Sequence, residues 1–126
     1  MITLAEENYL KAIWAISLNT NEKASTNAIA DEISTSAASV SDMLRKLQEK
    51  ELIKYEKYKG VELSEKGRNL ATSIIRKHRL WETFLVNKLA FNWGEVHDVA
   101  EQLEHIKSDE LVDKLDSFLG FPKFDP

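Results

Sequence analysis

The spacing of apolar residues constrains the fold of this chain most, because it is helical almost everywhere and alternates in one short stretch only. Tyr9, Leu10 and Ile13 begin a series at helical spacing, and later segments repeat the pattern. Between residues 52 and 63, apolar and polar side chains alternate on either side of a polar stretch that ends at Gly60. A period near 3.6 indicates a helix and a period of two a strand. The sequence therefore predicts a mainly α-helical chain with one small β-hairpin.

Hydroxyl and amide residues mark where the predicted helices begin. Thr3 with Glu6 forms a capping box, and Asn92 with Glu95 repeats its spacing. With 4 Gly and 2 Pro, the chain offers few other breaks. The expected order is a first helix that begins at Thr3, a loop at residues 19–23, helices at 26–33 and 37–50, and the hairpin at 52–63. Three further helices are expected after Ser64, Asn92 and Ser108. The helix after Asn92 is expected to reach Ile106, and the helix after Ser108 is expected to reach Leu119.

The absence of cysteine excludes several kinds of site. Disulfides, thiolate zinc sites, iron–sulfur clusters and cysteine nucleophiles all require a residue that this sequence lacks. No apolar run approaches the roughly 20 residues that span a bilayer. The first residues do not follow the basic-then-apolar plan of a signal peptide. We therefore expect a cytoplasmic protein without a membrane partner.

Charge is unevenly distributed along the chain, although the net charge is only −4. Residues 36–79 carry eleven Lys and Arg against six Asp and Glu, whereas residues 80–126 carry four against ten. A basic segment is what a phosphate-binding surface requires. Charge alone leaves open that these are merely solvated side chains.

The order short helix, tight turn, second helix and hairpin predicts a winged helix-turn-helix over residues 1–63, against the alternative of a generic helical subdomain. The second helix opens with small and hydroxyl side chains, which allow close approach to a major groove. Arg45, Lys46 and Lys50 are expected on its outer side, and the hairpin tip carries basic residues around an aromatic one. The residues expected to contact double-stranded DNA are Thr26, Ser36, Ala37, Ala38, Ser39, Ser41, Asp42, Arg45, Lys46, Lys57, Tyr58 and Lys59.

All three histidines lie in or directly beside the acidic segment, among carboxylates at helical spacing. His78 and Glu82 are four residues apart and so share a helix face. On one continuous helix, the four side chains at 97, 101, 104 and 105 would span an arc of about 100°. Imidazole and carboxylate donors without thiolate suit Mn²⁺, Fe²⁺, Co²⁺, Ni²⁺ or Zn²⁺. The candidate metal ligands on this pattern are His78, Glu82, His97, Glu101, Glu104 and His105.

Two other interpretations of this acidic half remain open. The carboxylates form a solvated helical stripe with histidines among them, or they build a carboxylate/histidine metalloenzyme. The enzyme is the weaker interpretation. The sequence repeats no Glu-x-x-His on two helices, and it contains neither an HExxH motif nor a phosphate-cradling glycine loop.

Six motifs in one order closely resemble the iron- and manganese-dependent repressors of the diphtheria toxin repressor family. They are Ala5-Glu-Glu-Asn-Tyr-Leu-Lys-Ala-Ile13, Ser39-Val-Ser-Asp-Met-Leu-Arg-Lys-Leu47, Tyr58-Lys-Gly-Val-Glu-Leu-Ser-Glu-Lys-Gly67, Arg76-Lys-His-Arg-Leu80, Trp93-Gly-Glu-Val-His97 and Leu103-Glu-His105. The resemblance implies a cytoplasmic homodimer, with a winged helix over residues 1–63 and a helical metal-binding and dimerisation domain over residues 64–126. It also implies that Mn²⁺ or Fe²⁺ switches on binding to an operator of metal-homeostasis genes.

The resemblance further assigns the metal ligands to two sites. His78, Glu82 and His97 match the family's ancillary site. Glu101, Glu104 and His105 match side chains of its primary, activating site. Asn8 stands where the first helix of the family supplies a Met or Asp ligand, so it offers only a neutral amide oxygen. Glu101 stands where iron-type members carry a Cys, and in this respect the sequence resembles manganese-type members. Lys11, however, stands where some manganese-type members carry a second first-helix carboxylate.

Several consequences of the resemblance stay open at this point. A metal shared by Asn8 and the acidic half would fix the winged helix relative to the dimer body. Residues 92–119, with Trp81, Phe84 and Leu85, either form the dimer surface or fill the core of the monomer. Many iron-type members continue into a small SH3-like domain, so this is a short member or a piece of a longer chain. The alternatives in function are a winged-helix regulator with a degenerate metal site, a metalloenzyme, and a metal buffer or interaction domain.

Overall fold

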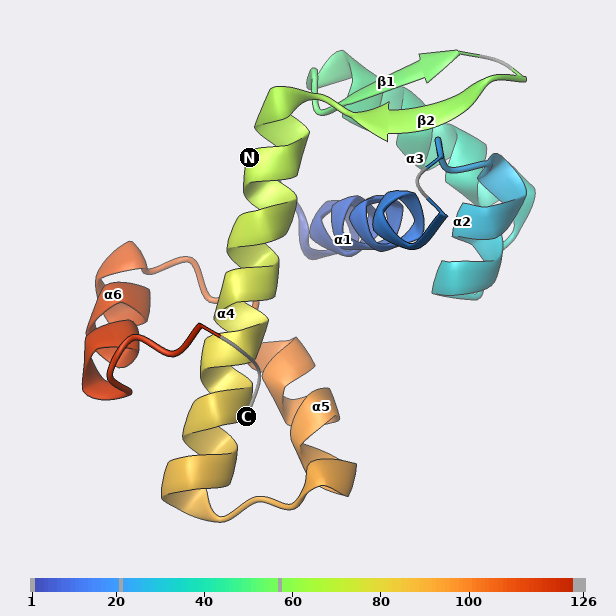
Figure 1. The fold of residues 1–126 in the computed structure, drawn as a ribbon. Coiled ribbons are helices and arrows are strands. Elements are labelled where there is room, and N and C mark those ends of the chain that lie inside the picture. Colours follow the sequence, from blue (N-terminus) through green and yellow to red (C-terminus); the bar gives the residue numbers. More distant parts are fainter. Residues whose placement is uncertain (1, 21, 57, 124–126) are drawn as a thin grey trace. The chain divides into compact units, whose positions relative to one another are not determined.

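The computed structural model describes residues 2–20, 22–56 and 58–123, which form six helices and one β-hairpin (Figure 1). In chain order the elements are α1 (Leu4–Thr20), α2 (Thr26–Ile33), α3 (Ala37–Glu49), β1 (Ile53–Glu56), β2 (Gly60–Leu63), α4 (Glu65–Leu89), α5 (Trp93–Leu103) and α6 (Asp109–Phe118). The mainly helical fold with one hairpin is confirmed. None of the helices described is long and apolar enough to cross a bilayer.

The chain divides into two compact units, residues 1–72 and 73–126. The division falls inside α4, after the predicted domain boundary between residues 63 and 64. The first unit therefore contains α1, α2, α3, the hairpin and the first residues of α4. The second contains the rest of α4 with α5 and α6.

The predicted caps begin the helices as the sequence indicated. The hydroxyls of Ser36 and Ser64 accept backbone N–H hydrogen bonds three residues ahead, at 3.1 and 3.0 Å. The amide oxygen of Asn92 and the hydroxyl of Ser108 accept equivalent backbone hydrogen bonds at 3.1 Å each. A side-chain oxygen at the N-cap satisfies a donor that the helix leaves unpaired. These helix starts are therefore fixed locally, by short polar side chains.

The first unit is built around an apolar core to which every element contributes. α1 packs against α2 and β2, α2 against α3, and α3 against β1. Leu10, Ile29 and Leu44 lie fully buried at the centre. The turn between α2 and α3 is tight because Ser34 adopts a left-handed conformation, with φ at 63°. This is the predicted helix-turn-helix, with Val40, Leu44 and Leu47 on the buried side of α3.

The hairpin forms the wing, and a third segment extends it. β1 and β2 are antiparallel, with Ile53 opposite Leu63. Ala24, in the loop before α2, exchanges two backbone hydrogen bonds with Val61 at 2.9 and 2.8 Å. A Cβ on Gly67 would lie 2.0 Å from the carbonyl oxygen of Leu52, so only glycine allows α4 to begin this close to the hairpin. The bridge at Ala24 was not predicted.

In the second unit, α6 and α5 each pack apolar residues against α4. Leu80 meets α6 through Val112 and Leu115, while Leu85 meets α5 through Val96 and Ala100. The guanidinium of Arg76 adds a hydrogen bond to Asp116 at 2.9 Å and a longer contact to Asp113 at 3.4 Å. The bond to Asp116 raises the pKa of Arg76 further above its usual value.

The predicted reach of the helix after Asn92 was wrong. α5 ends at Leu103 rather than continuing through Ile106, because Glu104 is its C-cap and the next backbone bond tightens. Ile106 N–H donates to the carbonyl of Leu103 at 3.1 Å, three residues back instead of four. Glu104 still has helical backbone angles and donates its N–H to the carbonyl of Ala100 at 2.9 Å, so the regular helix is lost only after it.

Candidate metal centre and nucleic-acid interface

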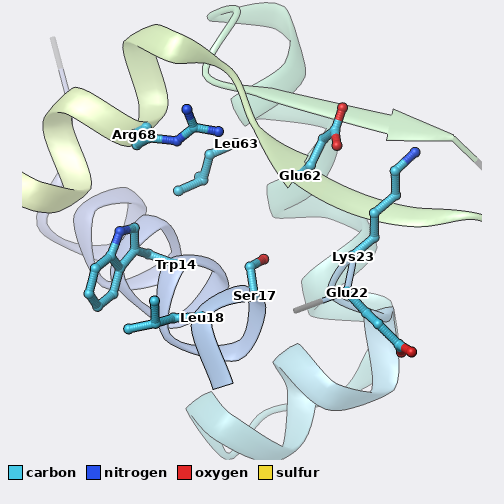
Figure 2. A pocket seen from close by; sticks show the side chains of 8 residues that line it. All are labelled: Trp14, Ser17, Leu18, Glu22, Lys23, Glu62, Leu63 and Arg68. Carbon is cyan, nitrogen blue, oxygen red and sulfur yellow. The ribbon is translucent and has the colours of Figure 1, made fainter. Parts of the chain in front are cut away.

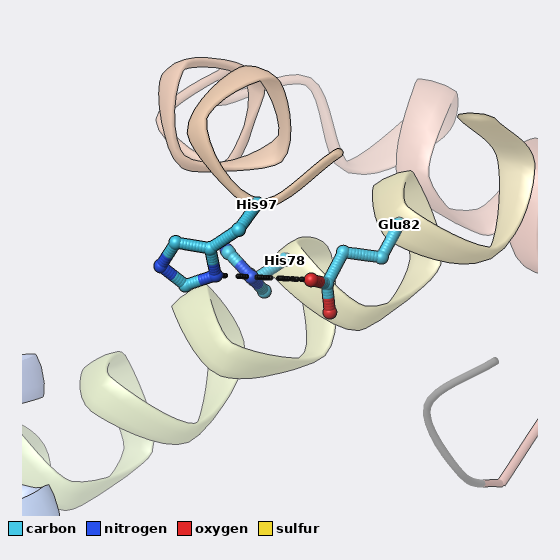
Figure 3. A group of neighbouring side chains, drawn as sticks. All are labelled: His78, Glu82 and His97. Atoms are coloured by element: carbon cyan, nitrogen blue, oxygen red, sulfur yellow. Dashed lines mark ion pairs between the residues drawn. The ribbon is translucent and has the colours of Figure 1, made fainter. Parts of the chain in front are cut away.

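Two imidazoles and one carboxylate converge in the second unit (Figure 3). His78 and Glu82 lie one turn apart on α4, and His97 comes from α5. Glu82 Oε2 is 3.3 Å from His78 Nε2 and 3.8 Å from His97 Nδ1. One ligand atom from each residue lies within 4.8 Å of the others. The three residues that the resemblance assigned to one site are therefore together.

The chemistry of this group fits a divalent transition-metal ion. A carboxylate oxygen and two imidazole nitrogens are borderline donors of the kind that Mn²⁺, Fe²⁺ and Zn²⁺ accept. Glu82 and His78 are mostly buried, with side-chain exposures of 11% and 14%, whereas His97 is 62% exposed. Solvent therefore reaches the group from the His97 side, where water can complete a coordination sphere.

Glu104 lies beside this group, in an environment that its sequence position did not reveal. Its side chain is fully buried, and Oε1 is 2.7 Å from Nδ1 of His78. Its other oxygen, Oε2, is 3.8 Å from Nε2 of His105. Glu101, on the exposed side of α5, has Oε2 at 4.0 Å from Nε2 of His97. The six candidate ligands of the second unit thus form one chain of alternating carboxylates and imidazoles.

The predicted primary site is less clearly formed. Within the part of the chain that the structure describes, His78, Glu82 and His97 are the one group of three such residues whose ligand atoms come this close. Glu101, Glu104 and His105 do not gather in the same way. Asn8 is half-buried on α1, in the first unit. The assignment of these four residues to a second ion stays a prediction.

The start of α3 presents the small side chains expected at a DNA groove. Ala37, Ala38 and Ser39 are exposed, and the Ser36 hydroxyl caps the helix while donating to the hydroxyl of Ser39. Ser41 is half-buried. None of these side chains is needed in the core, so this end of α3 is available for a ligand.

Charged residues follow on the same exposed side of α3. Asp42 and Arg45 form an exposed ion pair at 3.4 Å, and Lys46 is also exposed. An exposed pair of this kind is worth well under about 1 kcal/mol, so phosphate can compete for the arginine. Arg45 and Lys46 are therefore placed as a phosphate-binding surface requires.

The hairpin tip and the start of α2 carry the remaining predicted DNA contacts. Tyr58 is 93% exposed and has a positive φ of 68°. Lys59 is exposed and 3.3 Å from Glu56, and Thr26 is half-buried at the first residue of α2. The prediction for Lys57 lies outside the described residues. Tyr58 and Lys59 project from the wing as expected.

Lys50 does not lie free on the outer side of α3, as the sequence had suggested. Its Nζ is 2.8 Å from Oε1 of Glu6, whose side chain is only 3% exposed. Burial alone would raise the pKa of Glu6, but hydrogen bonds from Lys50 and Thr3 outweigh it and hold the pKa below its usual value. Glu6 Oε2 is buried without a hydrogen-bond partner among the described residues. Lys50 therefore neutralises a buried carboxylate rather than extending the basic surface of Arg45 and Lys46.

An open hollow of about 410 Å³ in the first unit involves none of the predicted site residues (Figure 2). It is lined by Trp14, Ser17, Leu18, Glu22, Lys23, Glu62, Leu63 and Arg68. Two acidic and two basic side chains face it, so it favours neither anions nor cations.

Family models match nearly the whole chain. Residues 1–61 match the N-terminal DNA binding domain of the iron dependent repressors, and residues 64–126 match their metal binding and dimerisation domain. The chain belongs to the iron-dependent repressor family. This confirms the predicted family and the predicted fold class. Both matched models describe domains of a repressor family rather than of an enzyme family.

Known proteins resemble the chain over different lengths. The diphtheria toxin repressor of Corynebacterium jeikeium is 39% identical over 83 residues, which are 66% of this chain and 35% of the relative. An HTH-type transcriptional regulator of Methanocaldococcus jannaschii is 32% identical over 113 residues, 90% of each chain. A solved manganese-dependent transcriptional repressor in complex with manganese has 45% identity and a TM-score of 0.86, over 95% of this chain and 55% of that one. The chain thus spans about half the length of this solved relative.

Proposed function

We propose that this chain is a metal-activated transcriptional repressor that binds double-stranded operator DNA as a homodimer. The observation that carries the proposal is the convergence of His78, Glu82 and His97 in the domain that matches the family's metal-binding and dimerisation model. The exposed start of α3 lies in the domain that matches the DNA-binding model. The two parts supply the sensor and the reader of such a switch.

The DNA contacts divide by their chemistry. Ala37, Ala38 and Ser39 are small enough for α3 to enter a major groove, where side chains distinguish the base pairs. Arg45, Lys46 and Lys59 provide cations for phosphates, which position the protein without reading sequence. We assign Ser36, Ser41, Asp42, Thr26, Lys57 and Tyr58 to the border of this surface.

His78, Glu82 and His97 would hold one divalent ion, and the finer assignment is Mn²⁺ or Fe²⁺. When bound, the ion supplies positive charge that offsets the carboxylates of the acidic half. A second ion is assigned to Asn8, Glu101, Glu104 and His105 on the resemblance to the family alone. Metal activation requires only that ions bind the DNA-competent state more tightly, with a coupling of typically 1–3 kcal/mol.

The second unit also presents apolar residues suited to a second copy. Leu89, Trp93 and Phe118 are more than half exposed, although they are large and apolar. Leu85, expected at the dimer surface or in the core, is 4% exposed and belongs to the core. A monomer in sedimentation at tens of micromolar protein, with metal present, would contradict the homodimer.

Fluorescence anisotropy tests the proposal with a labelled duplex from upstream of the gene itself and a scrambled duplex of equal length. Each is titrated at fixed salt in EDTA, in Mn²⁺ and in anaerobic Fe²⁺, because affinity for DNA depends steeply on salt. We expect selective binding that requires metal. Equal selective binding in EDTA would indicate a regulator with a degenerate metal site, an alternative that the neutral side chain of Asn8 favours.

A further inference from the structure

The fully buried carboxylate of Glu104 is paired with an imidazole nitrogen that faces away from the metal centre. Glu104 Oε1 lies 2.7 Å from His78 Nδ1, while His78 Nε2 lies 3.3 Å from Glu82 Oε2. A separation of 2.7 Å is typical of a hydrogen bond to a charged acceptor. His78 thus joins two carboxylates, one through each ring nitrogen.

The chemistry of this contact determines the tautomer of a neutral His78. While Glu104 is ionised it can only accept a hydrogen bond, so a neutral His78 then carries its proton on Nδ1. The lone pair then resides on Nε2, which is the nitrogen directed toward Glu82. A ligating histidine commonly donates its other N–H to a carboxylate, and this partner orients the ring and raises its basicity.

We propose that Glu104 is a positioning residue for the centre formed by His78, Glu82 and His97. Its Oε1 holds His78 in the Nδ1–H tautomer, with Nε2 aimed at the centre. This contact raises the affinity of the centre for a divalent cation, although Oε1 itself does not ligate the cation. The inference rests on the proposed function in one respect, namely that this centre binds a divalent ion. It gives Glu104 a role in addition to that of ligand to the second ion.

This arrangement also links the two halves of the acidic cluster. While Oε1 is engaged with His78, Oε2 points toward Nε2 of His105 at 3.8 Å. One buried carboxylate therefore lies between imidazoles that the family resemblance assigns to separate ions. Loss of the charge of Glu104 should weaken the His78 centre, even though the three ligands of that centre stay unchanged.

The first test reads the tautomer directly in the wild-type chain. Long-range ¹⁵N–¹H correlation spectra of the metal-free protein are recorded between pH 7 and pH 9, and the Nδ1 and Nε2 shifts of His78 are assigned. We expect the Nδ1–H tautomer. An Nε2–H tautomer would overturn the proposal, because the lone pair would then lie on Nδ1, facing Glu104 instead of the metal centre.

The second test measures affinity at this centre alone, with diamagnetic Zn²⁺ as the probe. The ring resonances of His97 report binding, because His97 belongs to the centre, whereas the contact that defines the role of Glu104 is made with His78. Glu104→Gln should lower the affinity about 10- to 100-fold, the usual effect of losing such an outer partner. Asp98→Asn removes an exposed carboxylate from the same helix and should leave the affinity unchanged.

The outcomes separate this inference from the proposed function. If Zn²⁺ leaves the His97 resonances of the wild-type chain unmoved, the proposed metal centre fails. If the wild-type chain binds and Glu104→Gln binds equally well, only the role of Glu104 is refuted. Glu104→Met fills the same buried volume without a polar group, so it repeats the test if the glutamine variant does not fold, and the tautomer measurement requires no variant.

Discussion

The two units place their candidate functional side chains at opposite ends of the burial scale. In the first unit, Arg45, Lys46 and Tyr58 stand exposed on a frame whose core is apolar. In the second unit, the candidate metal-site residues Glu82 and Glu104 are buried between the helices. A DNA-contacting surface can thus be changed without disturbing its fold, whereas most of the metal centre is also part of the interior. His97, exposed but part of the centre, is the exception that allows the two effects to be separated.

The largest expected effect comes from removing this exposed ligand. His97→Ala should lower metal affinity at the centre by more than about 100-fold, since a site of three protein ligands loses one of them. Its free energy of unfolding without metal should stay within about 0.5 kcal/mol of the wild type, because the side chain is 62% exposed. Calorimetric titration with Mn²⁺ and urea unfolding in EDTA measure the two quantities. A marked loss of stability in EDTA would show that His97 is structural.

The buried carboxylate of Glu6 in the first unit should contribute to stability, so a change in its surroundings should alter the free energy of unfolding. Lys50→Met leaves the Glu6 carboxylate without its cation, and we expect unfolding to become easier by about 1–3 kcal/mol. Because the folded pKa of Glu6 lies below its ordinary value, this contribution is present above about pH 4.5 and disappears as the pH falls through the folded pKa.

Urea unfolding from pH 7 down to pH 3 tests this expectation. The stability difference between wild type and Lys50→Met should be largest at neutral pH and should shrink in acid. Lys46→Met, an exposed lysine on the same helix, is the matched control and should change little. A difference that is constant over this range would rule out the Glu6 contact as its source.

The exposed cations should show the reverse pattern, with an effect on DNA binding and almost none on folding. Arg45→Ala should weaken operator binding about tenfold, the equivalent of about 1.4 kcal/mol. If Arg45 contacts a phosphate, the slope of log K against log salt should also fall by about 1. Anisotropy titrations at three salt concentrations measure both. An unchanged slope with relaxed sequence selectivity would instead assign Arg45 to a base.

The smallest effects come from matched helix caps in the two units. Ser36→Ala and Ser108→Ala each remove a hydroxyl that accepts one backbone hydrogen bond at 3.1 Å, so each should destabilise by about 1 kcal/mol. Only Ser36→Ala should also weaken DNA binding, because only that cap opens α3. Equal DNA affinity of the two variants would remove Ser36 from the interface.

Local signals predicted most of the fold. The caps at Ser64 and Asn92 and the change of period at residues 52–63 depend on neighbours a few positions away, and all three were found where expected. The bridge between Ala24 and Val61 joins segments far apart in the sequence, and no periodicity marks a single bridging residue. The predicted helix after Asn92 extended to Ile106 because the apolar spacing continues past Leu103, whereas the backbone tightens there and Ile106 bonds the carbonyl of Leu103.

The candidate metal site was likewise predictable where its contacts are local and not where they join distant segments. The spacing of His78 and Glu82 places them on one helix face, so their proximity follows from the sequence. His97 joins them from another helix, and only the family resemblance predicted it. That Lys50 neutralises Glu6 could not be read from the sequence, because ion pairs between distant positions leave no periodic signal. Tertiary contacts, rather than local preferences, determine which charged residues are available for a ligand.

The proposed function requires the metal centre of the second unit to control DNA binding by the first. The most direct test compares the wild type with Glu82→Gln in anisotropy titrations of one operator duplex, each in EDTA and in Mn²⁺. We predict that Mn²⁺ tightens binding of the wild type at least tenfold and leaves Glu82→Gln at its EDTA affinity. An equal response of both proteins to Mn²⁺ would contradict the claim, because activation would then not require the carboxylate that joins His78 and His97.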